Sequence, residues 1–93
     1  MQLGGRRVEP GEIEAVLRRQ ATVEDAVVVT ERDERTLCAV YTGVPDGASA
    51  LRLALSELLP PYMVPARFVW LSSLPLNPNG KIDRRRLAAE VSR

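Results

Sequence analysis

Residues 23–42 read VEDAVVVTERDERTLCAVYT, and this stretch decides the fold. Residues 26–29 form a continuous apolar and mostly β-branched run, and residues 36–42 carry a second apolar run beyond the charged residues 32–35. A continuous run of this kind is typical of a strand buried on both faces. Two such runs separated by a short polar turn indicate a β-hairpin. We therefore expect strands at residues 23–30 and 36–42, paired as a hairpin.

The segment before the hairpin favours a helix that follows a short loop and strand. Residues 2–9 are interrupted by glycine, and Pro10 suits the first turn of a helix. Ile13, Val16 and Leu17 lie on one face of a helix over residues 10–19. Glu12 and Glu14 are expected to face the positive end of the helix dipole.

The segment after the hairpin predicts a helix, a strand, a long loop and a last helix. Residues 48–59 carry an apolar stripe with helical spacing, and the two prolines that follow end the helix. Residues 62–65 precede a proline and are expected to be extended. Residues 67–71 form a third strand and residues 72–82 a loop. Asp83 can cap a final helix in which Leu87 and Val91 share one face.

This order of elements predicts an α+β fold. We expect a small mixed three-stranded sheet covered by about three helices, with a preceding β-loop element. Ninety-three residues are enough for one domain, residues 1–93, and too few for two. A chain of this size cannot build its own core and also enclose a deep ligand pocket. We therefore expect a module that functions in contact with a partner domain.

Composition argues against several classes of function. The net charge of +1 provides no strong field for nucleic acid or membranes. Three consecutive arginines at residues 84–86 would point in different directions on a helix and have no interleaved aromatic residues. The longest apolar-rich stretch, residues 48–59, is too short to cross a bilayer. We expect no binding to nucleic acid or membranes.

Cysteine and histidine usage argues against metal and thiol chemistry. The chain has no histidine and a single cysteine, Cys38, which lies in an apolar run. We expect no metal site and a buried structural thiol. Residues 1–6 contain no apolar signal-peptide core. A lone cysteine and the lack of such a core predict a reducing, cytoplasmic location.

The basic residues single out one position, because twelve are arginine and only Lys81 is lysine. Asn79 and Gly80 favour a tight turn that projects this side chain. A compact ammonium on a flexible stem suits a phosphate or carboxylate whose charge moves during reaction. The alternative is a solvated turn lysine that pairs weakly with Asp83.

A second candidate site lies near the N-terminus, at Gly4, Gly5, Arg6 and Arg7. Paired glycines let the backbone pass close to a ligand, and the arginines could contact phosphates. The alternative is a flexible loop with solvated charges.

Three segments resemble one family when they are taken together. They are GRRVEPGEIE at residues 5–14, LPPYMVP at residues 59–65 and LPLNPNGKIDR at residues 74–84. They are similar to conserved segments of the C-terminal subdomain of adenylate-forming enzymes, and most of all to the amino-acid adenylation domains of nonribosomal peptide synthetases. The segments occur in the family's order and spacing, and the resemblance covers essentially the whole chain.

The resemblance implies a mobile lid. A large N-terminal adenylation subdomain would bind ATP, Mg²⁺ and an amino acid, and the lid would supply Lys81 as the catalytic lysine for aminoacyl-AMP formation. Arg7, Asn79 and Gly80 would contact the substrate or nucleotide. The lid would then rotate, so that Gly4 and Gly5 line the path of the phosphopantetheine arm of a peptidyl carrier protein.

Two other interpretations remain at this level. The same lid could belong to an acyl- or aryl-CoA synthetase, or the chain could be a non-catalytic module that docks on a carrier protein. The family often carries a lysine where Gln2 stands and an arginine where Gly4 stands. We expect the chain, as an excised fragment or split subunit, to fold but activate nothing alone. Self-association through apolar surface is also expected.

Overall fold

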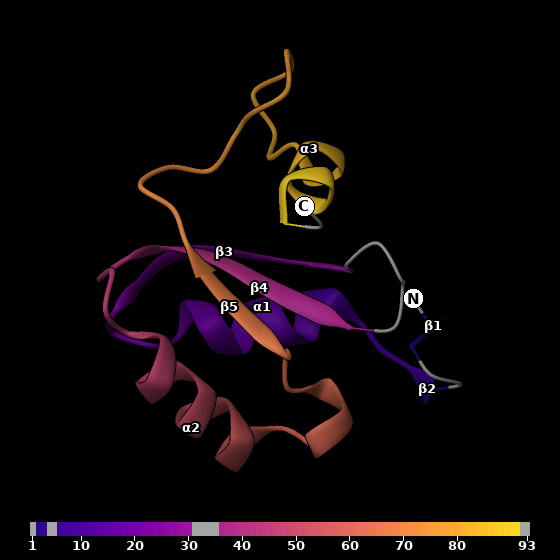
Figure 1. Ribbon diagram of the computed structural model, residues 1–93, viewed down its shortest axis with the longest axis vertical. Helices are drawn as coiled ribbons and strands as arrows, with labels where there is room; N and C mark the ends of the chain where they lie inside the picture. The colour runs from indigo at the N-terminus through magenta and orange to yellow at the C-terminus, as the bar shows by residue number, and fades with distance from the viewer. Residues whose placement is uncertain (1, 4–5, 31–35, 92–93) are drawn as a thin grey trace.

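The computed structural model describes residues 2–3, 6–30 and 36–91 (Figure 1). Its elements, in chain order, are β1 (Gln2–Leu3), β2 (Arg6–Arg7), α1 (Pro10–Arg18), β3 (Val23–Thr30), β4 (Leu37–Gly43), α2 (Ala48–Leu58), the 3₁₀ helix η1 (Pro61–Met63), β5 (Arg67–Trp70) and α3 (Arg84–Val91). The order matches the predicted one.

The main sheet has the strand order β3-β4-β5. Strands β3 and β4 pair antiparallel, so the predicted hairpin is confirmed, and β4 and β5 pair parallel. Strands β1 and β2 form a separate two-stranded ladder. The mixed three-stranded sheet with its helices confirms the α+β prediction.

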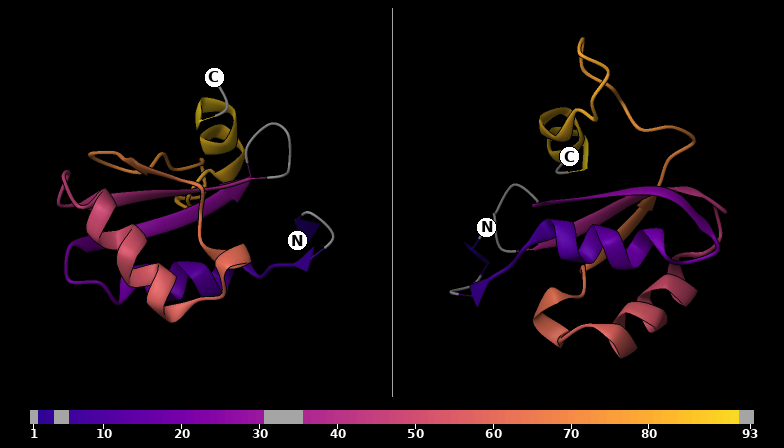
Figure 2. Two further views of the ribbon diagram at one scale, coloured as in Figure 1. Left: turned by 60° about the horizontal axis from the view of Figure 1, so that its bottom comes forward. Right: turned by 180° about the vertical axis from the view of Figure 1, so that it is seen from behind.

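Both faces of this sheet are covered, as the continuous apolar run at residues 26–29 predicted. Helices α1 and α2 lie on one face and α3 lies on the other (Figure 2). Side chains alternate between the two faces with a period of two residues. The first core contains Val8, Ile13, Leu17, Val23, Ala26, Val28, Leu37, Ala39, Tyr41, Leu51, Leu55 and Met63. The second core contains Val27, Val29, Cys38, Val40, Leu87 and Val91.

The connector between α2 and β5 departs from the prediction. Residues 61–63 turn into a 3₁₀ helix rather than staying extended, and only Val64, directly before Pro65, is extended. The N–H of Met63 donates to the Pro60 carbonyl at 2.9 Å. Its side chain is buried in the first core. Pro61 suits the first helical position, and burial of Met63 outweighs the preference for extended backbone.

The apolar stripe of α2 is narrower than predicted. Leu51 and Leu55 are buried, but Leu58 is 60% exposed. Leu59, directly after the helix, is half-buried and packs against the first core. The helix is therefore anchored mainly by Leu51 and Leu55, and Leu58 faces solvent.

Helix α3 begins as predicted. The backbone N–H of Arg86 donates to the Asp83 carboxylate at 3.0 Å, which is an N-terminal cap. Leu87 and Val91 are both buried against the second face of the sheet, and Cys38 lies buried beside them as a thiol that forms no disulfide. None of the helices in the described ranges has the length and apolar character that a membrane crossing requires.

Candidate functional site

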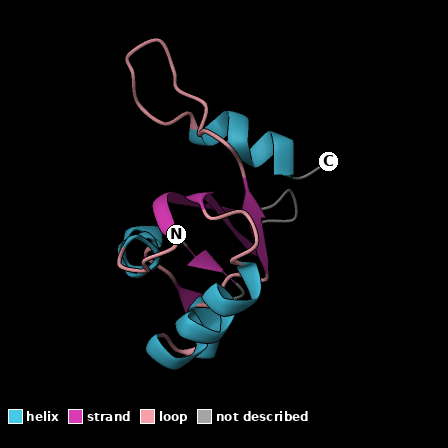
Figure 3. Cartoon of the chain, turned by 90° about the vertical axis from the view of Figure 1, so that its left-hand side faces the viewer, coloured by secondary structure: helices cyan, strands magenta, loops and turns pink. Residues whose placement is uncertain are grey.

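The segment between β5 and α3 projects from the body of the domain. We call residues 72–83 the lysine loop (Figures 1 and 3). It leaves the sheet just after the N–H of Leu71 donates to the Tyr41 carbonyl at 2.9 Å. It returns at Asp83, the cap of α3. The loop is therefore held by the core at both ends while its tip stands clear.

The tip is organised by Asn77. Its side-chain oxygen accepts the backbone N–H groups of Asn79 at 2.9 Å and of Lys81 at 3.0 Å. Its backbone N–H donates to the Lys81 carbonyl at 2.7 Å, and its carbonyl accepts the Gly80 N–H at 2.9 Å. Four hydrogen bonds around one residue fix the path of the backbone through the turn.

Gly80 supplies the conformation that this turn needs. Its φ is +79°, in the left-handed region where a side chain is disfavoured. An added Cβ would contact nothing within 4 Å, so the requirement is conformational and not one of space. The predicted tight turn at Asn79 and Gly80 is observed.

Below the tip the two arms of the loop pair. Leu76 and Ile82 form an antiparallel bridge, and the Asp83 N–H donates to the Pro75 carbonyl at 2.8 Å. Ile82 and Leu74 pack against the second core. The lysine loop is thus a short hairpin-like stalk with an apolar base and a hydrogen-bonded tip.

The Lys81 side chain is exposed at this tip. Within the described ranges, no carboxylate lies within ion-pair distance of its ammonium. The weak pairing with Asp83 considered above is absent, since the Asp83 carboxylate caps α3. A cation without a carboxylate neighbour remains available to an anion from outside the chain.

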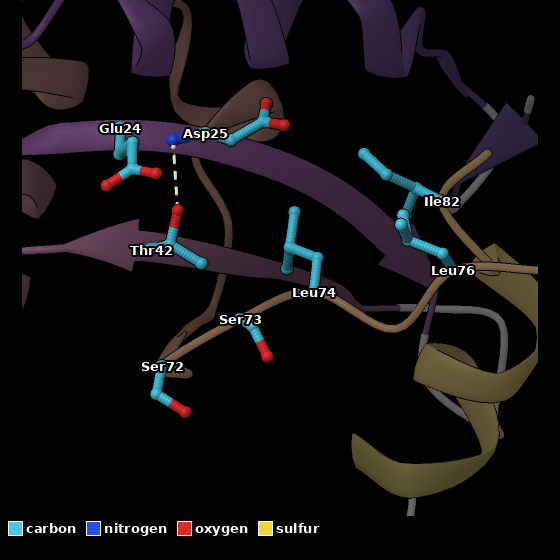
Figure 4. A pocket seen from close by; sticks show the side chains of 8 residues that line it. All are labelled: Glu24, Asp25, Thr42, Ser72, Ser73, Leu74, Leu76 and Ile82. Carbon is cyan, nitrogen blue, oxygen red and sulfur yellow. Dashed lines mark hydrogen bonds between the residues drawn. The ribbon is translucent and has the colours of Figure 1, made fainter. Parts of the chain in front are cut away.

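A shallow hollow of about 210 Å³ lies beside the arms of the loop (Figure 4). Its lining residues are Glu24, Asp25, Thr42, Ser72, Ser73, Leu74, Leu76 and Ile82. Thr42 accepts the Asp25 N–H at 3.1 Å, and the Asp25 carboxylate also accepts from Arg18 at 2.9 Å. Lys81 is not among the lining residues, so the hollow and the lysine are separate features.

One ion pair near the loop was not predicted from the sequence. The Arg84 guanidinium binds both oxygens of the Glu14 carboxylate, at 2.7 and 3.0 Å. Glu14 is 3% exposed and also accepts the Val28 N–H at 2.8 Å. The hydrogen bond with Glu14 raises the pKa of Arg84 above its ordinary value.

The prediction for Glu14 was incomplete. Glu14 lies three residues before Leu17, so helical spacing places it on the buried side of α1, and its burial could have been predicted. Its partner could not have been predicted, because Arg84 lies 70 residues away in the chain. The side chain therefore serves tertiary pairing.

The predicted site residues are distributed as follows. Asn79, Gly80 and Lys81 lie together at the tip of the lysine loop. Arg7 lies in β2, where it pairs with Gln2. Gly4 and Gly5 lie outside the described residues.

The chemistry that the described part of the site offers is electrostatic. An exposed ammonium on a fixed turn fits a phosphate or carboxylate. No group of three or more histidine, cysteine, aspartate or glutamate side chains in the described ranges could hold a metal ion. The described part of the loop therefore offers one exposed cation to an anionic group.

Comparisons with known proteins agree with these features. Residues 12–81 match the family described as the AMP-binding enzyme C-terminal domain. The chain is 45% identical over 91 residues to tyrocidine synthase 2 of Brevibacillus parabrevis. The aligned region covers 94% of this chain and 2% of that protein. The chain thus spans a very small part of this relative.

Two solved structures share the fold. NpsA of Klebsiella oxytoca, in complex with 3-hydroxyanthranilyl-AMSN, is 34% identical with a TM-score of 0.85, over 100% of this chain and 19% of that one. A holo four-domain nonribosomal peptide synthetase bound to AMP and glycine is 38% identical with a TM-score of 0.81, over 90% of this chain and 7% of that one. The family match includes both the buried Glu14 and Lys81 at the tip of the loop. On this sequence match and these shared folds, the chain belongs to the family of AMP-binding enzyme C-terminal domains.

Proposed function

We propose that this chain is the mobile lid of an amino-acid-activating adenylation domain of a nonribosomal peptide synthetase. Its partner in the first step is a large N-terminal adenylation subdomain that binds ATP, Mg²⁺ and the amino acid. The similarity to tyrocidine synthase 2 and to a four-domain synthetase bound to AMP and glycine supports this choice over a CoA ligase. The cytoplasmic location and the extent of the domain, residues 1–93, are part of the same proposal.

The observation that carries the proposal is the geometry of Lys81. The side chain is exposed and has no carboxylate partner among the described residues, while its backbone is fixed by Asn77. A solvated surface lysine needs no such scaffold. A lysine that must meet a reacting anion does, because misplacement of a charged group weakens its stabilisation of the transition state.

The proposed role of Lys81 in the first step is to stabilise charge. The amino-acid carboxylate attacks the α-phosphorus of ATP, the bond from that phosphorus to pyrophosphate breaks, and aminoacyl-AMP forms. Negative charge is redistributed over the phosphoryl oxygens during this transfer. The ammonium is attracted to that charge, while the Asn79 and Gly80 backbone lies next to it in the same turn. Arg7 is proposed as a further contact to the nucleotide or substrate.

The second step uses another part of the lid. After adenylation the lid rotates, Lys81 leaves, and the segment with Gly4 and Gly5 lines the path of the phosphopantetheine arm of a peptidyl carrier protein. The thiol of that arm attacks the aminoacyl carbonyl and releases AMP. One lid that serves two half-reactions is a form of hinge gating.

The test restores the large subdomain, either in trans or fused to this chain, and measures amino-acid-dependent ATP–pyrophosphate exchange. We expect Lys81→Ala to lower kcat/KM for exchange at least about 100-fold, or about 2.7 kcal/mol of transition-state stabilisation. We expect no exchange from the 93-residue chain alone.

The matched control is Arg19→Ala. Arg19 is an exposed cation that follows α1, on the face of the sheet away from the lysine loop, and exchange should stay within about twofold of the parent. Normal exchange by the Lys81→Ala protein would refute the catalytic role and favour a non-catalytic docking module. Transfer of the acyl group to free CoA in preference to a carrier protein would favour a CoA synthetase.

A further inference from the structure

Hydrogen bonds within the lysine loop hold its two arms and its tip together, so its orientation depends on its attachments. One attachment is the hydrogen bond from Leu71 to Tyr41 at the end of β5. A second is the packing of Leu74 and Ile82 against the second core. The third is the start of α3, where Asp83 ends the loop and Arg84 follows directly. Arg84 is three residues from Lys81. Whatever fixes Arg84 therefore fixes one arm of the stalk that carries the lysine.

Arg84 is fixed by the pair with Glu14, which differs from the other ion pairs that the structure describes. Arg18–Asp25 and Arg86–Glu90 are single contacts between partly exposed side chains, a kind that contributes little. The Glu14 side chain is 4% exposed and the Arg84 side chain is 52% exposed. Both oxygens of the buried carboxylate are bound by one guanidinium. A two-point contact of this kind restricts orientation as well as distance.

The pair also spans the edge of the sheet. Strand β3 is an edge strand, and its Val28 N–H donates to Glu14 while its Val28 carbonyl lies 3.5 Å from an Arg84 nitrogen. Glu14 comes from α1 on one face, and Arg84 from α3 on the other. The pair thus joins the two layers around an edge strand that would otherwise present unpaired backbone groups.

The buried end of the pair needs its partner. A carboxylate taken out of water is costly unless its charge is matched and its oxygens are hydrogen-bonded. Glu14 meets both conditions only while Arg84 stays in this place. The free energy of pairing therefore opposes any swing of α3 and of the loop away from the sheet.

We propose that Glu14 and Arg84 form a positioning clamp that sets the orientation of the lysine loop, and through it of Lys81, for the adenylating step. Neither residue needs to touch the substrate. The inference rests on the proposed function of Lys81 and adds the residues that aim it. The clamp should affect the half-reaction that uses Lys81 and spare the one that does not.

The test uses the chain completed with its large subdomain, and compares Arg84→Met with Arg85→Met. Methionine keeps much of the apolar stem and removes the fork. Arg85 is the next residue of α3 and is exposed, and no ion pair is described for it. We expect Arg84→Met to lower kcat for pyrophosphate exchange about tenfold with KM for ATP within about twofold, and Arg85→Met to change neither.

A double-mutant cycle with Lys81 separates positioning from general damage. If the clamp acts through the lysine, adding Arg84→Met to the Lys81→Ala protein should lower its exchange rate by less than about twofold. Thioester transfer from preformed aminoacyl-AMP should stay within about threefold of the parent. The conservative variant Arg84→Lys, which keeps the charge and loses the fork, should recover part of the exchange rate.

Other results would overturn the clamp. An equal loss in both backgrounds, or an equal loss in the thioester step, would mean that Arg84 only holds the fold together. If Arg84→Met does not yield folded protein, Glu14→Gln replaces it in the same cycle, since the amide can still accept from Val28. If Lys81→Ala lowers exchange while neither clamp variant does, the clamp proposal is refuted and the proposed function of Lys81 stands. Should Lys81→Ala itself leave exchange intact, the proposed function fails.

Discussion

The two faces of the sheet are built in different ways. The face under α1 and α2 is closed by two helices and holds the larger core, with Ile13, Leu17, Leu51 and Leu55 buried. The face under α3 is closed by one helix together with the base of a loop (Figure 2). The first face resembles ordinary layer packing, whereas the second combines packing with presentation of a charged side chain.

The difference shows how stability and chemistry are separated in a small domain. Helices on the first face can bury apolar surface without reaching solvent. The loop on the second face has to reach outward, so its hydrogen bonds are made within the loop and not with the core. We therefore expect variants of the first face to change the free energy of unfolding, and variants of the loop tip to change activity.

The largest effect on stability is expected from Leu55→Ala. Leu55 is fully buried in α2, so truncation should lower the free energy of unfolding of the 93-residue chain by about 3 kcal/mol through lost burial and a cavity. Urea denaturation measures this change. Leu53→Ala on the same helix, where Leu53 is 65% exposed, is the control and should change it by less than about 0.5 kcal/mol. Equal effects of the two would show that α2 does not anchor the first face.

A medium effect, on activity alone, is expected from Asn77→Ala. The side-chain oxygen that holds the Asn79 and Lys81 N–H groups is lost, which loosens the turn. We expect exchange by the completed enzyme to fall about tenfold, or about 1.4 kcal/mol, while the thermal midpoint stays within about 2 °C. Ser73→Ala, at the other end of the loop, should leave exchange unchanged. A large fall in the midpoint for Asn77→Ala would contradict the separation of the two faces.

The smallest effect is expected from Tyr41→Phe in the first core. Its hydroxyl is buried with no hydrogen-bond partner among the described residues. Removal should leave the free energy of unfolding unchanged or raise it by up to about 1 kcal/mol. A decrease of more than about 1 kcal/mol in the free energy of unfolding would mean that the hydroxyl makes a hydrogen bond in the folded chain.

The same variant tests a pH dependence. Burial raises the pKa of Tyr41 above its ordinary value of 10.0, with a smaller contribution from Asp46. Above that pH the unfolded chain releases the phenol proton while the folded chain keeps it, so the parent should lose stability as pH rises. Denaturation between about pH 9 and 11 should show a smaller loss for Tyr41→Phe than for the parent. Parallel losses would contradict the shift.

Most of the architecture could be predicted because local signals agreed with the tertiary result. The β-branched run at residues 26–29 required a strand with both faces covered. The apolar spacing in residues 10–19 and 48–59 required helices with one buried side. The connector at residues 61–63 could not be predicted, because burial of Met63 in a distant core decided its conformation.

The site divides in the same way. Asn79, Gly80 and Lys81 are adjacent, so the turn and its exposed cation could be predicted from local conformational preferences alone. The role of Asn77 as the centre of the hydrogen bonds was missed, although a side chain that accepts from residues two and four positions ahead is still a local feature. The roles of Gly4, Gly5 and Arg7 stay predictions.

By itself the sequence determined the elements, the two buried faces and the turn that carries the lysine, since each depends on residues close together in the chain. Only the tertiary structure decided how that turn is held. Glu14 and Arg84 are 70 residues apart, and they meet because two helices on opposite faces converge at one edge of the sheet. A buried charge selects its partner by position in space, which no local pattern encodes.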